Sequence, residues 1–349
     1  MRIAQIAPLA ERVPPKLYGG TERVVSWLTE ELVSLGHEVT LFASADSFTN
    51  ATLVPVWPSA IRLSRPRPDP FAPLASLLEV LASMAQSFDV IHCHIDWVHL
   101  PLLQRLSVPF LTTLHGRLDL PYLGRLAQAF PDAPFVSISD KQREPLPGLN
   151  WMATIHHGLP VTMFKPSSRA EGYLAFLGRI APEKGPEAAI RLATASGLPL
   201  RIAAKVEENR YFRERIQPFV DGDHIRFVGE VGERDKERFL QGAAALLFPI
   251  DWPEPFGLVM IEAMACGTPT IAFCRGSVPE IIDDGVSGFV VENEAEALSA
   301  IKTLPDLDRR GVRAAFERRF SAKRMAQDYV SIYARLAAGP DSARAIAAQ

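Results

Sequence analysis

The feature that most constrains the fold is a repeated alternation of short apolar segments with longer amphipathic segments. A parallel sheet needs this order, because a helix returns the chain to the same end of the sheet and covers one face. The apolar segments form two series, separated by the segment Asn150–Pro166. We therefore expect an α/β fold with two Rossmann-like units whose parallel sheets face a central ligand cleft.

The first series predicts five strands and an early helix. The helix follows Gly19-Gly20 and ends at Gly36, since apolar residues between these glycines recur at helical spacing. The Pro-rich segment Trp57–Pro73 is expected to be an irregular loop. The predicted strands are Arg2–Ala7, Glu38–Ala43, Asp89–His94, Phe110–Leu114 and Phe135–Ile138.

The second series predicts six strands with helices between them. The amphipathic stretch Ser321–Leu336 predicts a final helix, and the residues after Gly339 are expected to fray. A chain of 349 residues exceeds the comfortable size of one core. We expect an N-terminal domain over 1–158, with the helix in 321–349 packing back on it, and a C-terminal domain over 159–320. The predicted strands are Tyr173–Leu177, Leu200–Ala204, Ile225–Val228, Ala244–Pro249, Thr270–Phe273 and Gly288–Val291.

Composition excludes several classes of protein. A net charge of −3 lacks the basic footprint of a nucleic-acid binder, so no nucleic-acid partner is expected. A peripheral membrane contact stays open, because Lys and Arg can cluster on one face. No apolar run reaches the length of a membrane span, and the start reads as a strand rather than a secretory segment. Three cysteines argue against a disulfide framework. We expect a cytoplasmic enzyme.

The densest chemical signal is the segment Asp251–Pro269. Glu254 lies in a Pro-bounded loop after a predicted strand, and a helix is expected to begin at Phe256-Gly257-Leu258. The first amides of that helix are unpaired within it and suit an anion or sugar hydroxyls. Glu262, about two turns later, is placed to accept hydrogen bonds from ribose hydroxyls. Without the flanking Pro-Phe-Gly and Cys-Gly-Thr-Pro, the two glutamates would read as a capping acid and a solvated one.

With these motifs the sequence resembles the retaining glycosyltransferases of family 4, which have the two-domain GT-B fold. The family signature is Glu, seven residues, then Glu, matched here by Glu254 and Glu262. The resemblance extends from Tyr18–Glu22 to the final helix and includes Arg275–Ile282. It implies transfer of a hexose from a nucleotide-sugar, with UDP-sugars favoured and GDP-sugars possible. The acceptor is a sugar, a lipid-linked molecule or a small molecule that the sequence does not identify.

Two cations and two glycines are expected to hold the donor diphosphate. Arg179 and Lys184 follow the first strand of the second series, at positions where the family carries an Arg and a Lys. They would stabilise the charge that develops on the leaving diphosphate. Gly19 and Gly20 precede the first helix, where backbone amides can approach a phosphate.

Histidines at two strand ends complete the candidate site. His115 follows the strand Phe110–Leu114, and the resemblance implies that it contacts the donor sugar and stabilises an oxocarbenium-like transition state. His94 and Asp96 are candidates for the acceptor side. The His92-Cys93-His94 run also suggests a metal, but no second ligand cluster has recognisable spacing. Asp221-Gly222-Asp223 resembles an Asp-x-Asp metal motif and is expected to be a turn.

The resulting expectation is a sequential, retaining transfer with no cofactor and no metal. The resemblance implies attack on the same face of the sugar, with a donor phosphate oxygen taking the acceptor proton. Glu254 then positions the sugar and does not form a covalent bond. Three alternatives remain: a nucleotide-sugar epimerase of the same fold, a non-catalytic two-lobed sugar-binding protein, and a nicotinamide oxidoreductase. The last is disfavoured because the chain lacks a G-x-G-x-x-G sequence.

Overall fold

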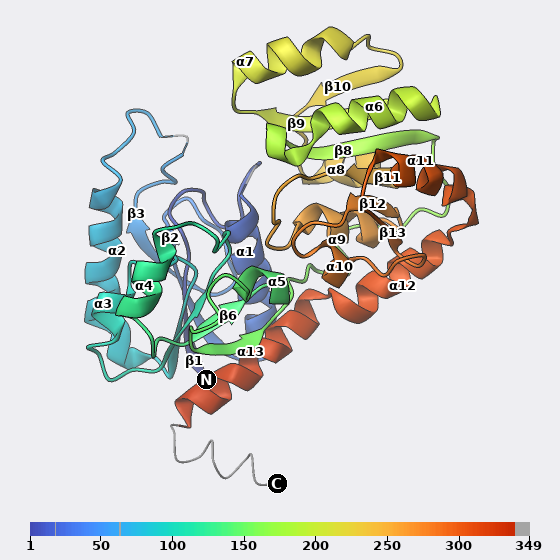
Figure 1. Cartoon of the computed structure of the whole chain (residues 1–349). Coiled ribbons are helices and arrows are strands. Elements are labelled where there is room, and N and C mark those ends of the chain that lie inside the picture. The colour runs from blue at the N-terminus through green and yellow to red at the C-terminus, as the bar shows by residue number, and fades with distance from the viewer. Residues whose placement is uncertain (18, 63, 339–349) are drawn as a thin grey trace. The chain divides into compact units, whose positions relative to one another are not determined.

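The computed structural model describes residues 1–17, 19–62 and 64–338, and the chain divides into two compact units. The first unit is Met1–Gly158 together with the segment that begins at Ala322, and the second is Leu159–Ser321. Figure 1 shows a sheet with flanking helices in each unit. Tyr18 and the tail after Gly339, both named by the sequence analysis, lie outside the described residues.

The first unit contains a seven-stranded sheet in which every neighbouring pair is parallel, in the order β3-β2-β1-β4-β5-β6-β7. Its strands are β1 (Arg2–Ile6), β2 (Glu38–Ser44), β3 (Thr52–Trp57), β4 (Val90–Cys93), β5 (Phe110–Thr113), β6 (Phe135–Ser137) and β7 (Trp151–Thr154). Its helices are α1 (Gly20–Ser34), α2 (Phe71–Met84), the 3₁₀ turn η1 (Ala85–Ser87), α3 (Leu100–Leu103), α4 (Leu123–Ala129), α5 (Asp140–Arg143) and α13 (Ala322–Ala337).

The last helix, α13, belongs to the first unit. It packs beside α1 and reaches β4, although it follows all the strands of the second unit in sequence (Figure 1). Its periodic apolar face explains this position, because Met325, Tyr329 and Tyr333 point into the unit and are buried.

The second unit contains a six-stranded sheet, also parallel throughout, in the order β10-β9-β8-β11-β12-β13. Its strands are β8 (Tyr173–Ile180), β9 (Leu200–Val206), β10 (Ile225–Gly229), β11 (Ala243–Phe248), β12 (Thr270–Phe273) and β13 (Gly288–Val291). Its longer helices are α6 (Pro186–Ser196), α8 (Glu233–Gln241), α9 (Leu258–Ala265), α11 (Glu294–Thr303) and α12 (Arg309–Arg319). Its shorter turns are η2 (Pro182–Lys184), α7 (Asn209–Tyr211), η3 (Phe212–Ile216), η4 (Gln217–Phe219), α10 (Val278–Ile281) and η5 (Leu304–Asp306).

This topology confirms the predicted fold class and corrects three details. The segment Asn150–Pro166 is not only a linker, because its beginning forms β7 at the edge of the first sheet. The strand predicted to end before Gly178 continues to Ile180, so Arg179 lies within β8. The other edge strand, β3, was not predicted, and the Pro-rich segment Trp57–Pro73 overlaps β3 at its start and α2 at its end.

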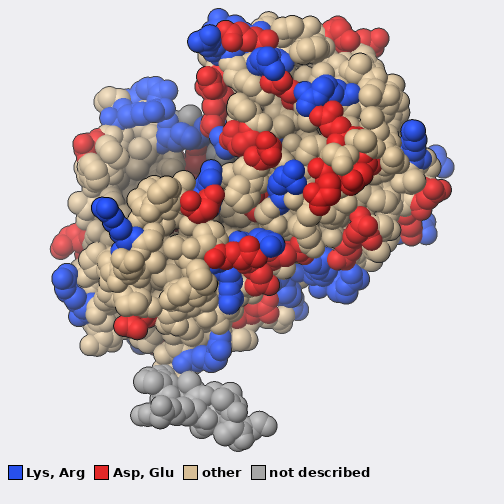
Figure 2. Space-filling model, in the orientation of Figure 1, with Lys and Arg blue, Asp and Glu red and all other residues tan. Residues whose placement is uncertain are grey.

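Among the described residues, no helix combines the length and apolar character that a membrane crossing requires. Acidic and basic side chains are interspersed on the face shown in Figure 2.

Candidate active site

The clearest cluster of predicted residues lies in the second unit, around Lys184 and Glu254. Lys184 ends η2, directly after β8, and Glu254 lies in the loop after β11. β8 and β11 are parallel neighbours, so their carboxyl ends bring these two loops together. Lys184 Nζ donates to Glu254 Oε2 at 2.5 Å, and the two side chains are 15% and 12% exposed. The structure therefore joins two predicted site residues that are 70 positions apart.

Trp252 completes this cluster and was not predicted as a site residue. Its Nε1–H donates to the same oxygen, Glu254 Oε2, at 2.9 Å. Its ring lies beneath Lys184, with Nζ 4.3 Å from the ring centroid, a cation–π distance. The carboxylate and the aromatic ring thus hold the ammonium from two sides. The signal for Trp252 was its place in the Asp251–Pro269 segment, two residues before the glutamate.

Two glycines allow the backbones of these loops to approach closely. Gly185 has φ 70° and contacts the backbone of Pro249, where a Cβ atom would collide with the carbonyl oxygen. Gly276 has φ 55°, and a Cβ atom there would collide with the backbone of Glu254. The amide of Ser277 then donates to the Glu254 carbonyl at 2.9 Å. Glu254 is therefore held through its main chain as well as its side chain.

Arg179 lies on β8, and two carboxylates pair with its guanidinium. It donates to Glu207 Oε2 at 2.8 Å and to Glu183 Oε1 at 3.2 Å, and its side chain is 24% exposed. Hydrogen bonds from Lys205 and then Arg179 lower the pKa of Glu207, against the opposite effect of burial. Glu183 precedes Lys184, and its carbonyl accepts from the amide of Asp251 at 2.9 Å. Arg179 is thus linked to the same pair of loops, and an anionic ligand would compete with carboxylates for it.

Glu262 lies on α9 and has a different environment from the other predicted residues. Its side chain is 3% exposed and accepts a hydrogen bond from Lys236 Nζ, on α8, at 2.6 Å. The predicted contact with ribose hydroxyls stays a prediction, and the structure adds that this carboxylate already has a buried cationic partner. Sequence reasoning missed Lys236, because α8 carries several charged residues in a row and the pattern does not single one out.

The start of α9 has the predicted form. Gly257, at φ 79°, is the N-cap, and the first helical residue is Leu258. Phe256 is 2% exposed and anchors the turn, while Ser277 Oγ donates to its carbonyl at 3.0 Å. This turn presents the amides of a helix N-terminus directly after the loop that carries Glu254.

In the first unit, Gly19 and Gly20 lie where the sequence placed them, at the start of α1. Gly19 is the N-cap at φ 149°, and a Cβ atom there would collide with Pro15. Glu22, in the first turn, is 5% exposed, and burial raises its pKa to about 7. Its Oε1 accepts from the amide of Glu11 at 3.3 Å.

The histidines of the first unit form a cluster at the ends of β4 and β5. His94 is 3% exposed, and both its ring nitrogens have partners: His115 Nε2 at 2.8 Å and Gln5 Oε1 at 2.9 Å. His115 is half-buried, and the ring of His157 stacks on it with centroids 5.2 Å apart. Burial lowers the pKa of His115 to about 3, so its imidazole is neutral near pH 7. Asp96 is exposed, at φ 54°, so of the two acceptor-side candidates it is the one open to solvent.

The possible metal motifs give no ligand cluster. Among the described residues, no group of three or more His, Cys, Asp or Glu side chains is arranged to hold an ion. Asp221 Oδ1 accepts from the amides of Asp223 and Ile225, both at 2.9 Å, which is the predicted turn. His92 hydrogen-bonds to Tyr333 and Thr113 through its two nitrogens.

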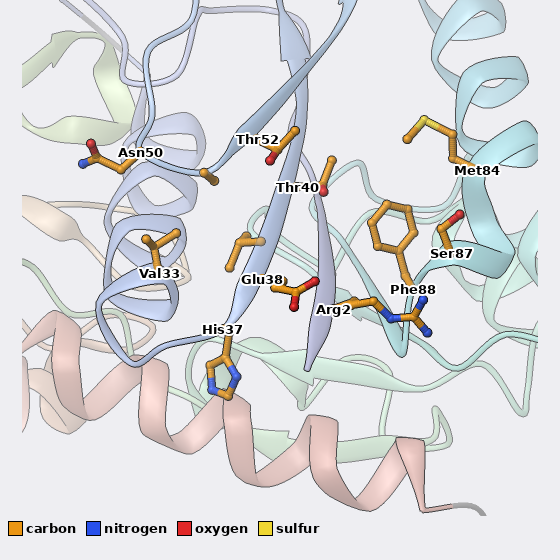
Figure 3. Close-up of a pocket in the computed structure, with 12 residues that line it drawn as sticks. Arg2, Val33, His37, Glu38, Thr40, Asn50, Thr52, Met84, Ser87 and Phe88 are labelled. Atoms are coloured by element: carbon orange, nitrogen blue, oxygen red, sulfur yellow. The ribbon is translucent and has the colours of Figure 1, made fainter.

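Two surface depressions lie away from these residues. One, of about 490 Å³, is lined by Arg2, Glu38, Thr40 and Thr52 at the starts of β1, β2 and β3 (Figure 3). The other, of about 370 Å³, includes Tyr173, Arg201 and Arg226 at the starts of β8, β9 and β10. Both lie at amino-terminal edges of parallel sheets, whereas ligands of such sheets bind at the carboxyl ends. Neither depression coincides with the candidate site.

Comparison with known proteins identifies the class of protein. A family model described as Glycosyltransferase Family 4 matches residues 18–173, and one described as Glycosyl transferases group 1 matches residues 163–313. Sucrose-phosphate synthase from Thermosynechococcus elongatus has a TM-score of 0.80 at 21% identity, over 97% of this chain and 99% of that chain. HepE of Anabaena in complex with UDP-glucose has a TM-score of 0.74 at 16% identity, over 96% and 100%. The fold is that of the GT-B glycosyltransferases.

Curated relatives agree with this class. A D-inositol 3-phosphate glycosyltransferase of Saccharomonospora viridis is 31% identical over 212 residues, which are 52% of this chain and 49% of the relative. The protein of the same name from Mycolicibacterium smegmatis is 26% identical over 337 residues, 78% of this chain and 75% of the relative. The chain therefore spans about half of the first relative and three quarters of the second. It belongs to glycosyltransferase family 4.

Proposed function

We propose that this glycosyltransferase moves a hexose from a nucleoside-diphosphate sugar to a hydroxyl group of its acceptor, with retention at the anomeric carbon. The observation that carries the proposal is the contact of Lys184 with Glu254 and Trp252, at the carboxyl ends of two neighbouring strands. A cation, a carboxylate and the start of α9 thus gather at the sheet edge where parallel sheets bind nucleotides. The second unit is accordingly the donor domain and the first the acceptor domain.

The proposed roles follow from charge. As the glycosidic bond breaks, the electron pair stays on the diphosphate oxygen, and the cations Arg179 and Lys184 stabilise that charge. Glu254 accepts hydrogen bonds from sugar hydroxyls, and its rigid main-chain attachment keeps it in place. The resemblance assigns His115 to the sugar, and a donor phosphate oxygen to removal of the acceptor proton. Two fixed cations supply the charge that a metal supplies in other transferases, so we expect turnover without added metal.

A UDP-sugar is the favoured donor, and a GDP-sugar is the second choice. The support is that the similar structure of HepE holds UDP-glucose. The relatives named for inositol phosphate support a hydroxyl-bearing acceptor, such as a sugar, a lipid-linked molecule or a small polyol.

A thermal-shift panel tests the donor first. UDP, GDP, ADP and their sugars are tested one at a time, each at a large excess over the dissociation constant that is typical of a nucleotide site. A ligand at about 100 times its dissociation constant adds about 2.7 kcal/mol to the free energy of unfolding, and so raises Tm. We expect a shift with UDP or GDP compounds, and an equal absence of shift with all of them would contradict the proposal.

The second step uses the donor that binds. The donor is incubated with inositol phosphates, phosphatidylinositol and simple sugars, in the presence and absence of EDTA. We expect an α-linked product from an α-linked donor, and the same rate with EDTA. An inverted product would refute retention. Accumulation of an epimer without acceptor would favour the epimerase alternative, and binding of a free sugar without nucleotide would favour the binding protein.

A further inference from the structure

A chain of hydrogen bonds crosses the interior of the first unit from α13 to His115. The amide nitrogen of Gln5 donates to the hydroxyl oxygen of Tyr333 at 3.1 Å. The amide oxygen of Gln5 lies 2.9 Å from His94 Nε2, and His94 Nδ1 lies 2.8 Å from His115 Nε2. Gln5 and Tyr333 are fully buried, and His94 is 3% exposed, so water does not compete for the hydrogen bonds among these three residues.

The imidazoles of this chain are neutral. Burial lowers the pKa of His94 far below its usual range and that of His115 to about 3. A neutral imidazole has one N–H and one lone pair, so each ring donates through one nitrogen and accepts through the other. The direction of one hydrogen bond therefore sets the direction of the next.

The Gln5 carbonyl fixes that direction. A carbonyl oxygen only accepts, so His94 Nε2 carries the hydrogen and His94 Nδ1 is an acceptor. His115 must then donate to His94 through Nε2, which leaves the lone pair on His115 Nδ1. Among the described residues, this buried Nδ1 has no hydrogen-bond partner.

The orientation of Gln5 depends on Tyr333. The Tyr333 hydroxyl accepts from the Gln5 amide and lies 2.7 Å from His92 Nδ1, to which it can donate. If the Gln5 amide turned over, both imidazoles would reverse, and His115 would have a buried Nδ1–H without an acceptor. A buried N–H without a partner is rarer in proteins than a buried acceptor without one, which favours the observed orientation.

We propose that Gln5 and Tyr333 are positioning residues that hold His115 as its Nε2–H tautomer, so that Nδ1 accepts a hydrogen bond from a hydroxyl of the sugar substrate. The substrate part of this proposal rests on the proposed function, whereas the tautomer part does not. A sugar hydroxyl fits, because it is a donor and Nδ1 is an acceptor that needs one.

The tautomer is read directly by long-range ¹H–¹⁵N spectra of the full chain labelled with ¹⁵N-histidine. The chain has eight histidines, and the resonances of His115 are those absent from His115→Gln. We expect the wild-type ring to show the nitrogen shifts of the Nε2–H form. A ring with the hydrogen on Nδ1, or a charged ring near pH 7, would overturn the proposal.

Four variants test what sets the tautomer. Gln5→Met removes the amide, and Tyr333→Phe removes the hydroxyl that accepts from it. Both variants should therefore give a mixture of the two His115 tautomers. Gln5→Glu keeps an oxygen opposite His94 Nε2 and should retain the wild-type form. Tyr329→Phe is the matched control, because Tyr329 is buried on the same helix and its hydroxyl contacts Thr113 instead of Gln5. Unchanged spectra in both Gln5→Met and Tyr333→Phe would remove Gln5 and Tyr333 from the positioning role.

Transfer assays connect the tautomer with the reaction. If the two forms become equal, the competent fraction is one half, and kcat/KM should fall about twofold from this cause. Gln5→Glu should restore it, and Tyr329→Phe should leave it unchanged. A loss in Gln5→Met that Gln5→Glu does not restore would refute the substrate part. If no donor or acceptor is ever turned over, the proposed function fails, while the nitrogen spectra still decide the tautomer.

Discussion

Replacing Lys184 with Met separates the structural role of the Lys184–Glu254 pair from its role in transfer. Met has a similar length and no charge, so the aliphatic contacts with the Trp252 ring remain while the ammonium is lost. Glu254 then keeps the hydrogen bond from Trp252 Nε1, but its carboxylate, only 12% exposed, loses the nearest cation.

The expected loss of stability follows from this burial. Exposed ion pairs contribute at most about 1 kcal/mol. Removing one partner of a fully buried pair costs about 3–5 kcal/mol, because the other charge stays in a poorly solvated place. Side chains that are 15% and 12% exposed fall between these cases, so we expect a loss of about 2–3 kcal/mol. For a unit of this size that corresponds to a fall in Tm of about 4–12 °C.

The double variant Lys184→Met/Glu254→Gln gives the decisive comparison. The neutral amide of Gln still accepts from Trp252 and needs no cation, so thermal unfolding should return to within about 1 kcal/mol of wild type. Transfer should not return, because Lys184 no longer stabilises the diphosphate, and kcat/KM should stay about 10²–10³ lower. Recovery of both stability and transfer in the double variant would refute the assignment of Lys184 to the leaving group.

Three further changes test other parts of the site. Arg179→Ala should lower kcat/KM by about 10²–10³. Its free energy of unfolding should change by about 1 kcal/mol or less, because the carboxylate partners of Arg179 are well exposed. Turnover equal to that of the wild type would exclude Arg179 from the site. Gly276→Ala should reduce both stability and transfer, because the added Cβ atom displaces the Glu254 backbone. The control is Gly285→Ala, at φ 72° with open space around it, which should lower the free energy of unfolding by about 1 kcal/mol through αL strain alone. Equal losses of stability in the two variants would contradict the close contact of Gly276 with Glu254. Burial raises the pKa of Glu22 from 4.5 to about 7, so the folded state binds the proton more tightly and the free energy of unfolding should fall between about pH 4.5 and 7, by about 3 kcal/mol. Glu22→Gln should abolish that fall in pH-dependent denaturant unfolding, and an unchanged pH profile would show that Glu22 is not its source.

Sequence patterns found the central strands of both sheets and missed the two edges of the first. Central parallel strands are buried on both faces, so they read as continuous apolar runs, as in β11. β3 is largely half-exposed and contains Pro55, a residue that strands tolerate at a sheet edge. β7 is half-buried at every position and shows no alternation. Neither carries the pattern that distinguishes a strand from a loop.

The same reasoning explains which site residues sequence analysis could find. Lys184 and Glu254 each follow a predicted strand, and the pairing of those strands was enough to bring them together. The partner of Glu262 depends on how α8 is rotated against α9, which local sequence does not determine. The hydroxyls that pair with His92 and Thr113 belong to Tyr333 and Tyr329 of α13, more than 200 positions later, where both tyrosines read only as apolar positions of an amphipathic helix.

The return of α13 to the first unit has a consequence for synthesis of the protein. The chain leaves the first unit after Gly158 and comes back at Ala322, so the second unit is an insertion within the first. On the ribosome, Leu159–Ser321 is complete before the last helix emerges. Until then Gln5 and His92 lack the phenol groups that they contact in the finished protein. The part of the chain that is made first is therefore the last to mature, and a nascent chain stalled before Ala322 holds a complete second unit beside an unfinished first one.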